Sequence, residues 1–292
     1  MKPAPFEWFS TSTTEEALAL LGEHGEHARP LAGGQSLIPA MNFRLARPAV
    51  LVDLNGITEL SGVAVQADGV LRCGAMTRQG ALEKSDMVAA HAPLLAEALP
   101  FVAHAAIRTR GTVGGSIAHG DPAAEIPAVM AALGARYLVL SSGGQRWLAA
   151  DAFMTGLFVT ALEPGELLVA IEIPPMAPRT GWGFLEMARR HGDFALAGVA
   201  CTLTLDDTGN CEGARIVAFG IGDGPVLCTA AADVLVGATP GLEVIREAAA
   251  AVASDVTPSS DVHASAAYRR SLVEVLARRA LARAADRVPL LQ

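Results

Sequence analysis

The chain has 292 residues and a formal net charge of −8, a length that fits one large domain or two ordinary ones. Hydrophobic residues make up 51% of it, which supplies a sizeable core and argues against disorder. The acidic balance disfavours nucleic-acid binding, because phosphate backbones are bound by basic surfaces. No apolar run reaches the roughly 18 residues of a membrane-spanning helix, so we expect no membrane span.

The four cysteines, Cys73, Cys201, Cys211 and Cys228, show no C-x-x-C spacing. We therefore expect no metal site and no iron–sulfur cluster built by this chain alone, and we expect the cysteines to be small buried apolar residues. The N-terminal residues contain no apolar stretch typical of a secretory signal. These features together predict a protein of the reducing cytoplasm.

The first half of the chain is expected to mix short helices and strands. Ser12 followed by Glu15 predicts a capping box and a helix that runs to about Glu23. The apolar spacing after Asp86 predicts one helix that ends at Pro100. The other expected elements are a strand entering a glycine loop at 28–34, a buried strand at 49–54, a hairpin at 63–75, a helix at 123–134, a hairpin at 136–150 and a strand at 166–174.

The segment 174–181 contains three prolines and is the best candidate for a domain boundary. Three or four strands are expected beyond it, followed by helices at 230–236, 242–254 and 268–288. In the last helix, Tyr268, Leu272, Val275, Leu276 and Ala280 are expected to share a buried face, with the arginines mainly on the opposite face. Strands and helices mix without a regular alternation, so the α+β class is favoured.

Two segments have the composition of anion-binding loops. "AGGQS" (32–36) and "TVGGS" (112–116) each contain adjacent glycines and a hydroxyl residue. Glycine lets a backbone approach a phosphate closely, and successive N–H groups then form an anion-binding concavity. Either segment alone is better explained as a plain turn, as Gly143-Gly144 is, but the pair could hold the two phosphates of a dinucleotide from opposite sides. Neither matches the Rossmann or P-loop pattern.

The wider segments "LAGGQSLIPAMNFRLARP" and "IRTRGTVGGSIAHGDPAAEIPAVMAALGA" together resemble the FAD-binding medium subunit of molybdenum hydroxylases. This group includes the carbon monoxide dehydrogenase medium chain and the flavin domain of xanthine dehydrogenase, and the resemblance continues through "ARRHGDFALAGVA" to the end of the chain. It implies an FAD-binding domain of the PCMH type at 1–176, made of two α+β subdomains at about 1–56 and 57–176. A smaller C-terminal α/β domain at 177–292 would follow.

The resemblance also implies which residues bind FAD. Backbone N–H groups and hydroxyls would hold the pyrophosphate, from Ala32, Gly33, Gly34, Gln35, Ser36 and Leu37 on one side and from Thr112, Gly114, Gly115 and Ser116 on the other. The further implied contacts are Glu125 near the ribityl and phosphate region with Asp121 beside it, Leu167 or Leu168 at the adenine, Val102, and Asp193 with Phe194 over the isoalloxazine ring.

Three positions differ from relatives. Ser116 stands where many carry Asn, and Phe194 stands where some carry Tyr. Glu186 stands where many relatives carry Lys, whose charge would stabilise negative charge at N1 and O2 of the reduced flavin. A glutamate cannot do that. From the local sequence alone, Phe194 is equally consistent with a core aromatic, and Arg108 and Arg110 could either neutralise the pyrophosphate or serve other contacts.

The implied function is that of an FAD-containing electron-transfer subunit. A small subunit would carry two [2Fe–2S] clusters, and a large subunit would carry the molybdopterin cofactor at which substrate is hydroxylated. The assembly would be a heterotrimer, with dimerisation of that heterotrimer left open. Two alternatives stay open from the sequence: a self-sufficient FAD-dependent oxidase or reductase, and a non-catalytic assembly subunit.

Overall fold

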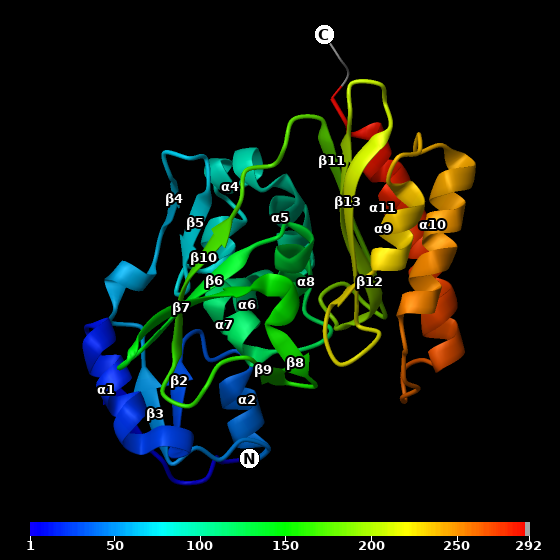
Figure 1. The fold of residues 1–292 in the computed structure, drawn as a ribbon. Coiled ribbons are helices and arrows are strands. Elements are labelled where there is room, and N and C mark those ends of the chain that lie inside the picture. The colour runs from blue at the N-terminus through cyan, green and yellow to red at the C-terminus, as the bar shows by residue number, and fades with distance from the viewer. Residues whose placement is uncertain (290–292) are drawn as a thin grey trace.

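The computed structural model describes residues 1–289 and orders them as three main sheets with flanking helices (Figure 1). The first sheet is parallel and has the order β1 (Glu7–Ser10), β3 (Val50–Asp53), β2 (Ala28–Leu31). Helix α1 (Thr14–His24) connects β1 to β2, and α2 (Leu37–Asn42) lies between β2 and β3, as parallel strands require crossover connections. Leu31 pairs with Asp53, so β2 and β3 end at the same edge of the sheet.

The second sheet is antiparallel and has the order β4 (Val63–Val65), β5 (Leu71–Gly74), β10 (Leu167–Ile173), β6 (Arg136–Ser141), β7 (Gly144–Ala149). A small hairpin, β8 (Met154–Gly156) with β9 (Val159–Thr160), lies beside it. The helices between β5 and β6 are α3 (Gln79–Leu82), α4 (Asp86–His91), α5 (Pro93–Ala98), α6 (Ala105–Arg108), α7 (Val113–His119) and α8 (Glu125–Ala132). Single 3₁₀ turns occur at Gly25–His27, Thr58–Leu60, Leu99–Phe101 and Ala150–Ala152.

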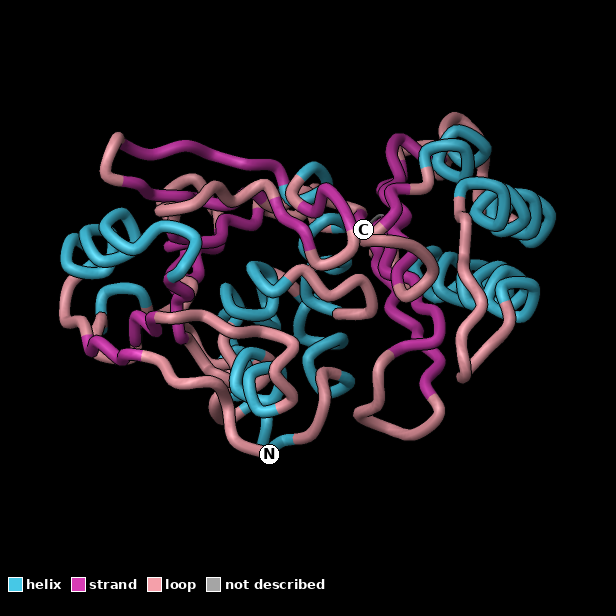
Figure 2. The backbone as a smooth tube through the Cα atoms, turned by 90° about the horizontal axis from the view of Figure 1, so that it is seen from below, coloured by secondary structure: helices cyan, strands magenta, loops and turns pink. Residues whose placement is uncertain are grey.

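The third sheet is antiparallel, in the order β11 (Thr180–Ala188), β12 (Ala195–Leu205), β13 (Cys211–Phe219), β14 (Val226–Leu227). Helices α9 (Thr229–Leu235), α10 (Leu242–Asp255) and α11 (Ala266–Asp286) cover its outer face (Figures 1 and 2). Its inner face meets α5 and α8 of the preceding domain. The chain is therefore an α+β protein with a region of two main sheets followed by a smaller C-terminal region of one sheet and three helices.

The cores follow from these layers. One cluster of buried side chains lies under α5, α7 and α8 and extends to Phe184 and Phe219 on the inner face of the third sheet. A second fills the space between that sheet and α9–α11, and a third lies in the N-terminal parallel sheet. Since the first cluster is shared by the two domains, their packing against each other is part of the apolar core.

Most of the predicted elements are present, but three differ. The helix predicted from Asp86 to Pro100 is two helices separated at Ala92, because Pro93 has no N–H to donate and disfavours a helical residue before it. The first helix is capped by Thr13, whose side chain accepts from the N–H of Glu16, so the capping box lies one residue later than predicted. The segment 113–119, predicted as part of a loop, is helix α7.

The buried face of α11 is rotated relative to the predicted one. Tyr268 is half exposed, whereas Arg269 is only 7% exposed. The Arg269 guanidinium donates to the carbonyl oxygens of Leu196 (2.6 Å) and Gly220 (3.0 Å) and pairs with Asp261. A buried arginine of this kind satisfies strand-end carbonyls, and apolar periodicity alone does not reveal it.

All four cysteines are free and buried, which confirms their prediction as small apolar core residues. No helix within residues 1–289 has both the length and the hydropathy needed to cross a bilayer.

Candidate functional site

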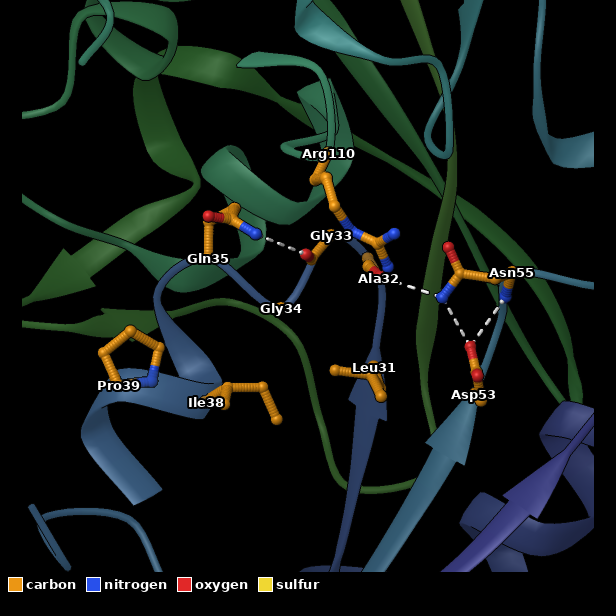
Figure 3. A pocket seen from close by; sticks show the side chains of 10 residues that line it. All are labelled: Leu31, Ala32, Gly33, Gly34, Gln35, Ile38, Pro39, Asp53, Asn55 and Arg110. Atoms are coloured by element: carbon orange, nitrogen blue, oxygen red, sulfur yellow. Dashed lines mark hydrogen bonds between the residues drawn. The ribbon is translucent and has the colours of Figure 1, made fainter. Parts of the chain in front are cut away.

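The two glycine-containing segments are far apart in sequence but lie side by side. Figure 3 shows Arg110, which precedes the second segment, beside Gly33 of the first. A Cβ on Gly33 would collide with the backbone carbonyl of Arg110 and lie 2.8 Å from the Cα of Gly111. A Cβ on Gly115 would lie 3.5 Å from the Cβ of Ala32. The first segment therefore packs directly against the residues that enter and begin α7, and glycine is needed where the backbones approach.

The first segment follows β2 and turns into α2. Gly34 has a positive φ of 72°, a conformation that glycine adopts without strain. Among residues 1–289, no protein acceptor is paired with the backbone N–H groups of Gly33 to Leu37. Gly33, Gly34 and Gln35 of this row line a pocket of about 340 Å³, together with Leu31, Ala32, Ile38, Pro39, Asp53, Asn55 and Arg110. Successive unpaired N–H groups of this kind form an anion-binding concavity.

The second segment is arranged differently from the expectation. Thr112 caps α7 by accepting from the N–H of Gly115 (3.0 Å). The N–H of Val113 donates to Thr77 (3.0 Å), and that of Gly114 donates to Ala75 (2.9 Å). Because these groups are paired within the protein, the segment cannot offer a row of free N–H donors as the first one does. Its glycines instead allow close packing, since a Cβ on Gly114 would lie 2.5 Å from the Cβ of Ala75.

A chain of hydrogen bonds that the sequence analysis did not predict links the two segments. The guanidinium of Arg78 donates to the carbonyl of Arg110 and to Asn55 Oδ1 (2.6 Å). The amide of Asn55 in turn donates to the carbonyl of Ala32 (3.0 Å) and to Asp53. The backbone of Arg78 also pairs with Thr112. One signal was present: Asn55 follows a strand of the parallel sheet, where ligands commonly bind beyond the carboxyl ends of strands.

The two arginines near the second segment have separate roles. Arg108 is buried, pairs with both carboxylate oxygens of Glu83 (2.8 and 2.9 Å) and donates to the carbonyl of Val102 (2.9 Å). It therefore fixes the turn after Pro100. Arg110 is exposed and lines the pocket beside Gly33, so it is the arginine placed to meet an anion there.

The predicted acidic residues lie at the other end of α7 and at the start of α8. Glu125 is the first residue of α8 and only 7% exposed. Burial raises its pKa to about 7, and the neighbouring charge of Asp121 raises it further while Arg108 lowers it. Burial also raises the pKa of Asp121, whose carboxylate accepts from the N–H of Ala123 (2.9 Å).

Leu167 and Leu168 lie outside the pocket of the first glycine segment. Both lie in β10, the central strand of the second sheet, and both are 4% exposed. Their side chains contribute to two different core clusters, and neither lines the pocket of the first segment. Val102 is likewise buried.

The turn between β11 and β12 lies over the segment after Phe101. A Cβ on Gly192, which has a φ of 86°, would lie 2.5 Å from the ring of His104. Phe194 is 72% exposed, so the alternative interpretation of Phe194 as a core aromatic is wrong. Asp193 is also exposed. Both side chains are thus available to a ligand or a partner.

Comparisons with known proteins identify the family. The protein-family model for the FAD-binding domain in molybdopterin dehydrogenase matches residues 4–176. The protein-family model for the carbon monoxide dehydrogenase flavoprotein C-terminal domain matches residues 182–284. The chain belongs to the FAD-binding medium subunits of the molybdenum hydroxylases. The carbon monoxide dehydrogenase medium chain of Afipia carboxidovorans is 40% identical over 98% of this chain and 99% of its own length.

Other members of the medium-subunit family are similar over the same extent. The alpha subunit of the 6-hydroxypseudooxynicotine dehydrogenase complex of Paenarthrobacter nicotinovorans is 39% identical, with 98% of this chain and 97% of the relative covered. A carbon monoxide dehydrogenase structure from Hydrogenophaga pseudoflava superposes with a TM-score of 0.96 at 36% identity, covering 99% of this chain and 100% of that one. A medium subunit of this family is a flavoprotein that works within an oxidoreductase complex.

Proposed function

We propose that the backbone N–H groups of Gly33 to Leu37 bind the pyrophosphate of FAD. The observation that carries this assignment is the row of N–H groups without protein acceptors at the pocket of the first segment. Successive N–H groups without protein acceptors suit an anionic group, and the exposed guanidinium of Arg110 adds a positive charge at the same pocket. The residues present therefore fit FAD.

The second segment has a supporting role in this proposal. Thr112 and Gly115 set the start of α7 so that Ala32 can approach to van der Waals distance. Ser116 lies in the first turn of α7, where we propose that its hydroxyl contributes to FAD binding. At the far end of α7, Asp193 and the exposed Phe194 are the candidates for covering the isoalloxazine ring, since a large aromatic face suits stacking.

FAD, when bound, supplies the electron chemistry: it accepts and passes on electrons singly or in pairs. The residues of this chain bind and orient it and set its electrostatic surroundings. We propose that the chain receives electrons from a small subunit with [2Fe–2S] clusters and delivers them to an external acceptor. A large molybdopterin subunit would hydroxylate the substrate, in a heterotrimer. Relatives named as medium, alpha and beta subunits of such dehydrogenases support this arrangement.

We further propose that the FAD-binding domain spans 1–176, in two subdomains at about 1–56 and 57–176, and that the C-terminal domain spans 177–292. The change of sheet between Ile173 and Thr180 supports that boundary. The four free, buried cysteines suit work in the reducing cytoplasm.

The experiment that tests the proposed function is the visible absorption spectrum of the purified chain, followed by identification of the cofactor released on denaturation. Flavin absorption bands and release of intact FAD are the expected result. A colourless chain that does not take up added FAD would contradict the proposal.

A further inference from the structure

We propose that Glu186 is an uncharged carboxylic acid in the folded protein at neutral pH, kept so by its burial and by Glu125 of the neighbouring FAD-binding domain, and that it serves the flavin as a hydrogen-bond donor rather than as a charge. The part that concerns the flavin rests on the proposed function, which assigns Asp193 and Phe194, in the turn that follows β11, to the isoalloxazine ring.

The direction of Glu186 follows from the alternation of side chains along β11. Gly181 and Gly183 lie against the backbone of α11, where a Cβ on either would meet the carbonyls of Ala284 and Ala280. Phe184 and Trp182 face the opposite way, into the core shared with the FAD-binding domain. Glu186 shares the parity of Phe184 and therefore faces the FAD-binding domain, not α11.

The interface next to Glu186, between the third sheet and the start of α8, is enclosed by apolar side chains and backbone groups. Glu186 pairs with Gly198 of β12, and the ring of Phe219 occupies the space where a Gly198 side chain would stand. The next residue, Gly220, donates its N–H to the carbonyl of Pro122 (2.9 Å). This bond brings the start of α8, and with it Glu125, to the same end of the third sheet.

Neither carboxyl has a cation to hold its charge. Glu186 Oε2 is buried without a hydrogen-bond partner, and within residues 1–289 neither glutamate forms an ion pair. Arg108 is the cation whose charge reaches Glu125, but its guanidinium is already paired with Glu83. A buried carboxylate without a partner is costly, and the ordinary outcome is that the group keeps its proton.

The other charged groups near the interface between the two domains do not change the lack of a cation paired with Glu186 or Glu125. On α5, Glu97 is paired with two arginines of α11, Arg283 and Arg287. In the turn after β11, Arg189 contacts His263 (3.1 Å), and Arg190, His191 and Asp193 are exposed to solvent. Asp121 adds a further negative charge on the α8 side, near Glu125. The net effect at this interface is an excess of carboxyl groups.

The titration properties agree with this geometry. Burial and, to a smaller extent, the charge of Glu125 together raise the pKa of Glu186 to about 8. Burial also raises the pKa of Glu125, to about 7. Carboxyl groups that interact in this way titrate as a pair, and the first proton is lost well before the second. At neutral pH the pair therefore holds at least one proton, and Glu186 is the residue that carries it.

A neutral acid and a cation act differently on a reduced flavin. A lysine at this position would stabilise negative charge at all pH values at which proteins are handled. A protonated Glu186 offers a hydrogen bond instead, in the manner of buried neutral carboxylic acids that serve as donors. When Glu186 loses its proton, its charge opposes reduction. The structure thus implies a flavin whose tendency to be reduced falls with rising pH more steeply than in an E186Q variant.

The proton itself is tested first, in the chain without FAD. The infrared carbonyl-stretch band of a protonated carboxylic acid should be present at neutral pH in the wild-type chain and in E274Q, which changes an exposed glutamate of α11. The band should be weaker in E186Q, where Glu125 alone can carry it, and absent in the double variant E125Q/E186Q, and in E125Q it should titrate at lower pH than in the wild type. Absence of the band at neutral pH in the wild type, or a band in E186Q as strong as in the wild type, would overturn the proposal. This result does not depend on whether FAD binds.

The second measurement is the reduction potential of FAD in the loaded chain, by spectroelectrochemistry, at about pH 6 and about pH 9.5. At the lower pH, the reduction potentials of FAD in the wild type and in E186Q should be equal. At the higher pH, the reduction potential in the wild type should be below that in E186Q. E186K should have the higher potential at both values. Equal potentials of wild type and E186Q at both values would contradict the role toward the flavin while leaving the binding of FAD itself established.

Discussion

Arg78 Nη2 donates a 2.6 Å hydrogen bond to Asn55 Oδ1, and through this bond the edge of the first sheet is tied to the start of α7. The same guanidinium holds the carbonyl of Arg110, while the Asn55 amide holds that of Ala32. Two segments that are far apart in the sequence are thereby fixed at one separation. The pocket proposed for the FAD pyrophosphate is lined by the first segment and by Arg110, which precedes the second.

Removal of this linkage should weaken FAD binding more than it weakens folding. Hydrogen bonds that involve a charged group contribute about 1.5–3 kcal/mol each, so Arg78→Ala should raise the Kd for FAD by about tenfold or more. Arg78→Lys should recover part of the loss, since it restores charge but not the two-way geometry. Flavin fluorescence titration measures the affinity, and Arg278→Ala, at an exposed position on α11, is the control. Unchanged affinity in Arg78→Ala would argue against the linkage.

Gly33→Ala should separate the two segments. A Cβ at this position meets the Arg110 carbonyl, and overpacking of this kind costs about 1–3 kcal/mol. We expect the variant to be purified with little or no FAD. Gly213→Ala is the matched control, because a Cβ at Gly213 meets no atom within 4 Å. The ratio of flavin to protein absorbance checks the prediction, which fails if both variants retain FAD equally.

The stability of the FAD-free chain should fall as the pH rises from about 4.5 to about 8. The pKa values of Glu125 and Glu186 are raised in the folded state, to about 7 and about 8. Between the unfolded and folded pKa values the native state binds more protons than the unfolded state, so the free energy of unfolding decreases with pH. One pKa unit corresponds to about 1.4 kcal/mol, and we expect E186Q to remove a decrease on the order of 1–3 kcal/mol. Urea unfolding across this pH range measures the slope.

The contact between the two domains has a polar part that can be tested separately. Glu97 of α5 pairs with Arg287 (2.5 Å) and Arg283 (2.9 Å) of α11, and Arg287 stacks over Trp182 at 5.1 Å. Glu97→Ala leaves both arginines without their partner, and we expect a loss of about 1–3 kcal/mol in unfolding experiments. Because the site lies elsewhere, FAD affinity at low denaturant should be unchanged. A large loss of FAD without a loss of stability would contradict this division of roles.

The amino-acid sequence was sufficient to predict the class of fold and most of its strands. Local signals are strong at these places: Asp68-Gly69 and Gly143-Gly144 are hairpin turns, and the apolar run of β10 is a central strand. The break in the helix at Pro93 was missed because the helical spacing of apolar residues continues past this proline. The backbone cannot continue one helix there, because proline has no N–H to donate. The buried face of α11 was predicted wrongly because Arg269 is a charged residue whose burial depends on a hydrogen bond and an ion pair with residues outside the helix. Its residue type alone predicts exposure.

The candidate site was predictable only in part. Glycine pairs mark where backbones approach closely, and both segments do meet. Which of them keeps its N–H groups free depends on neighbouring strands: Thr77 and Ala75 accept from the start of α7, and no local pattern in "TVGGS" indicates that. Arg78 and Asn55 act through contacts between distant parts of the chain, so pattern and spacing cannot reveal them.

The most direct test of the account is the response of the Gly33 and Gly34 backbone amides to ligands, measured by NMR on the chain labelled with ¹⁵N-glycine. If these N–H groups bind the pyrophosphate, their resonances shift when FAD is added and not when riboflavin, which has no phosphate, is added. The amide of Gly213 should respond to neither. Unmoved Gly33 and Gly34 resonances in a chain that has bound FAD would contradict the central claim.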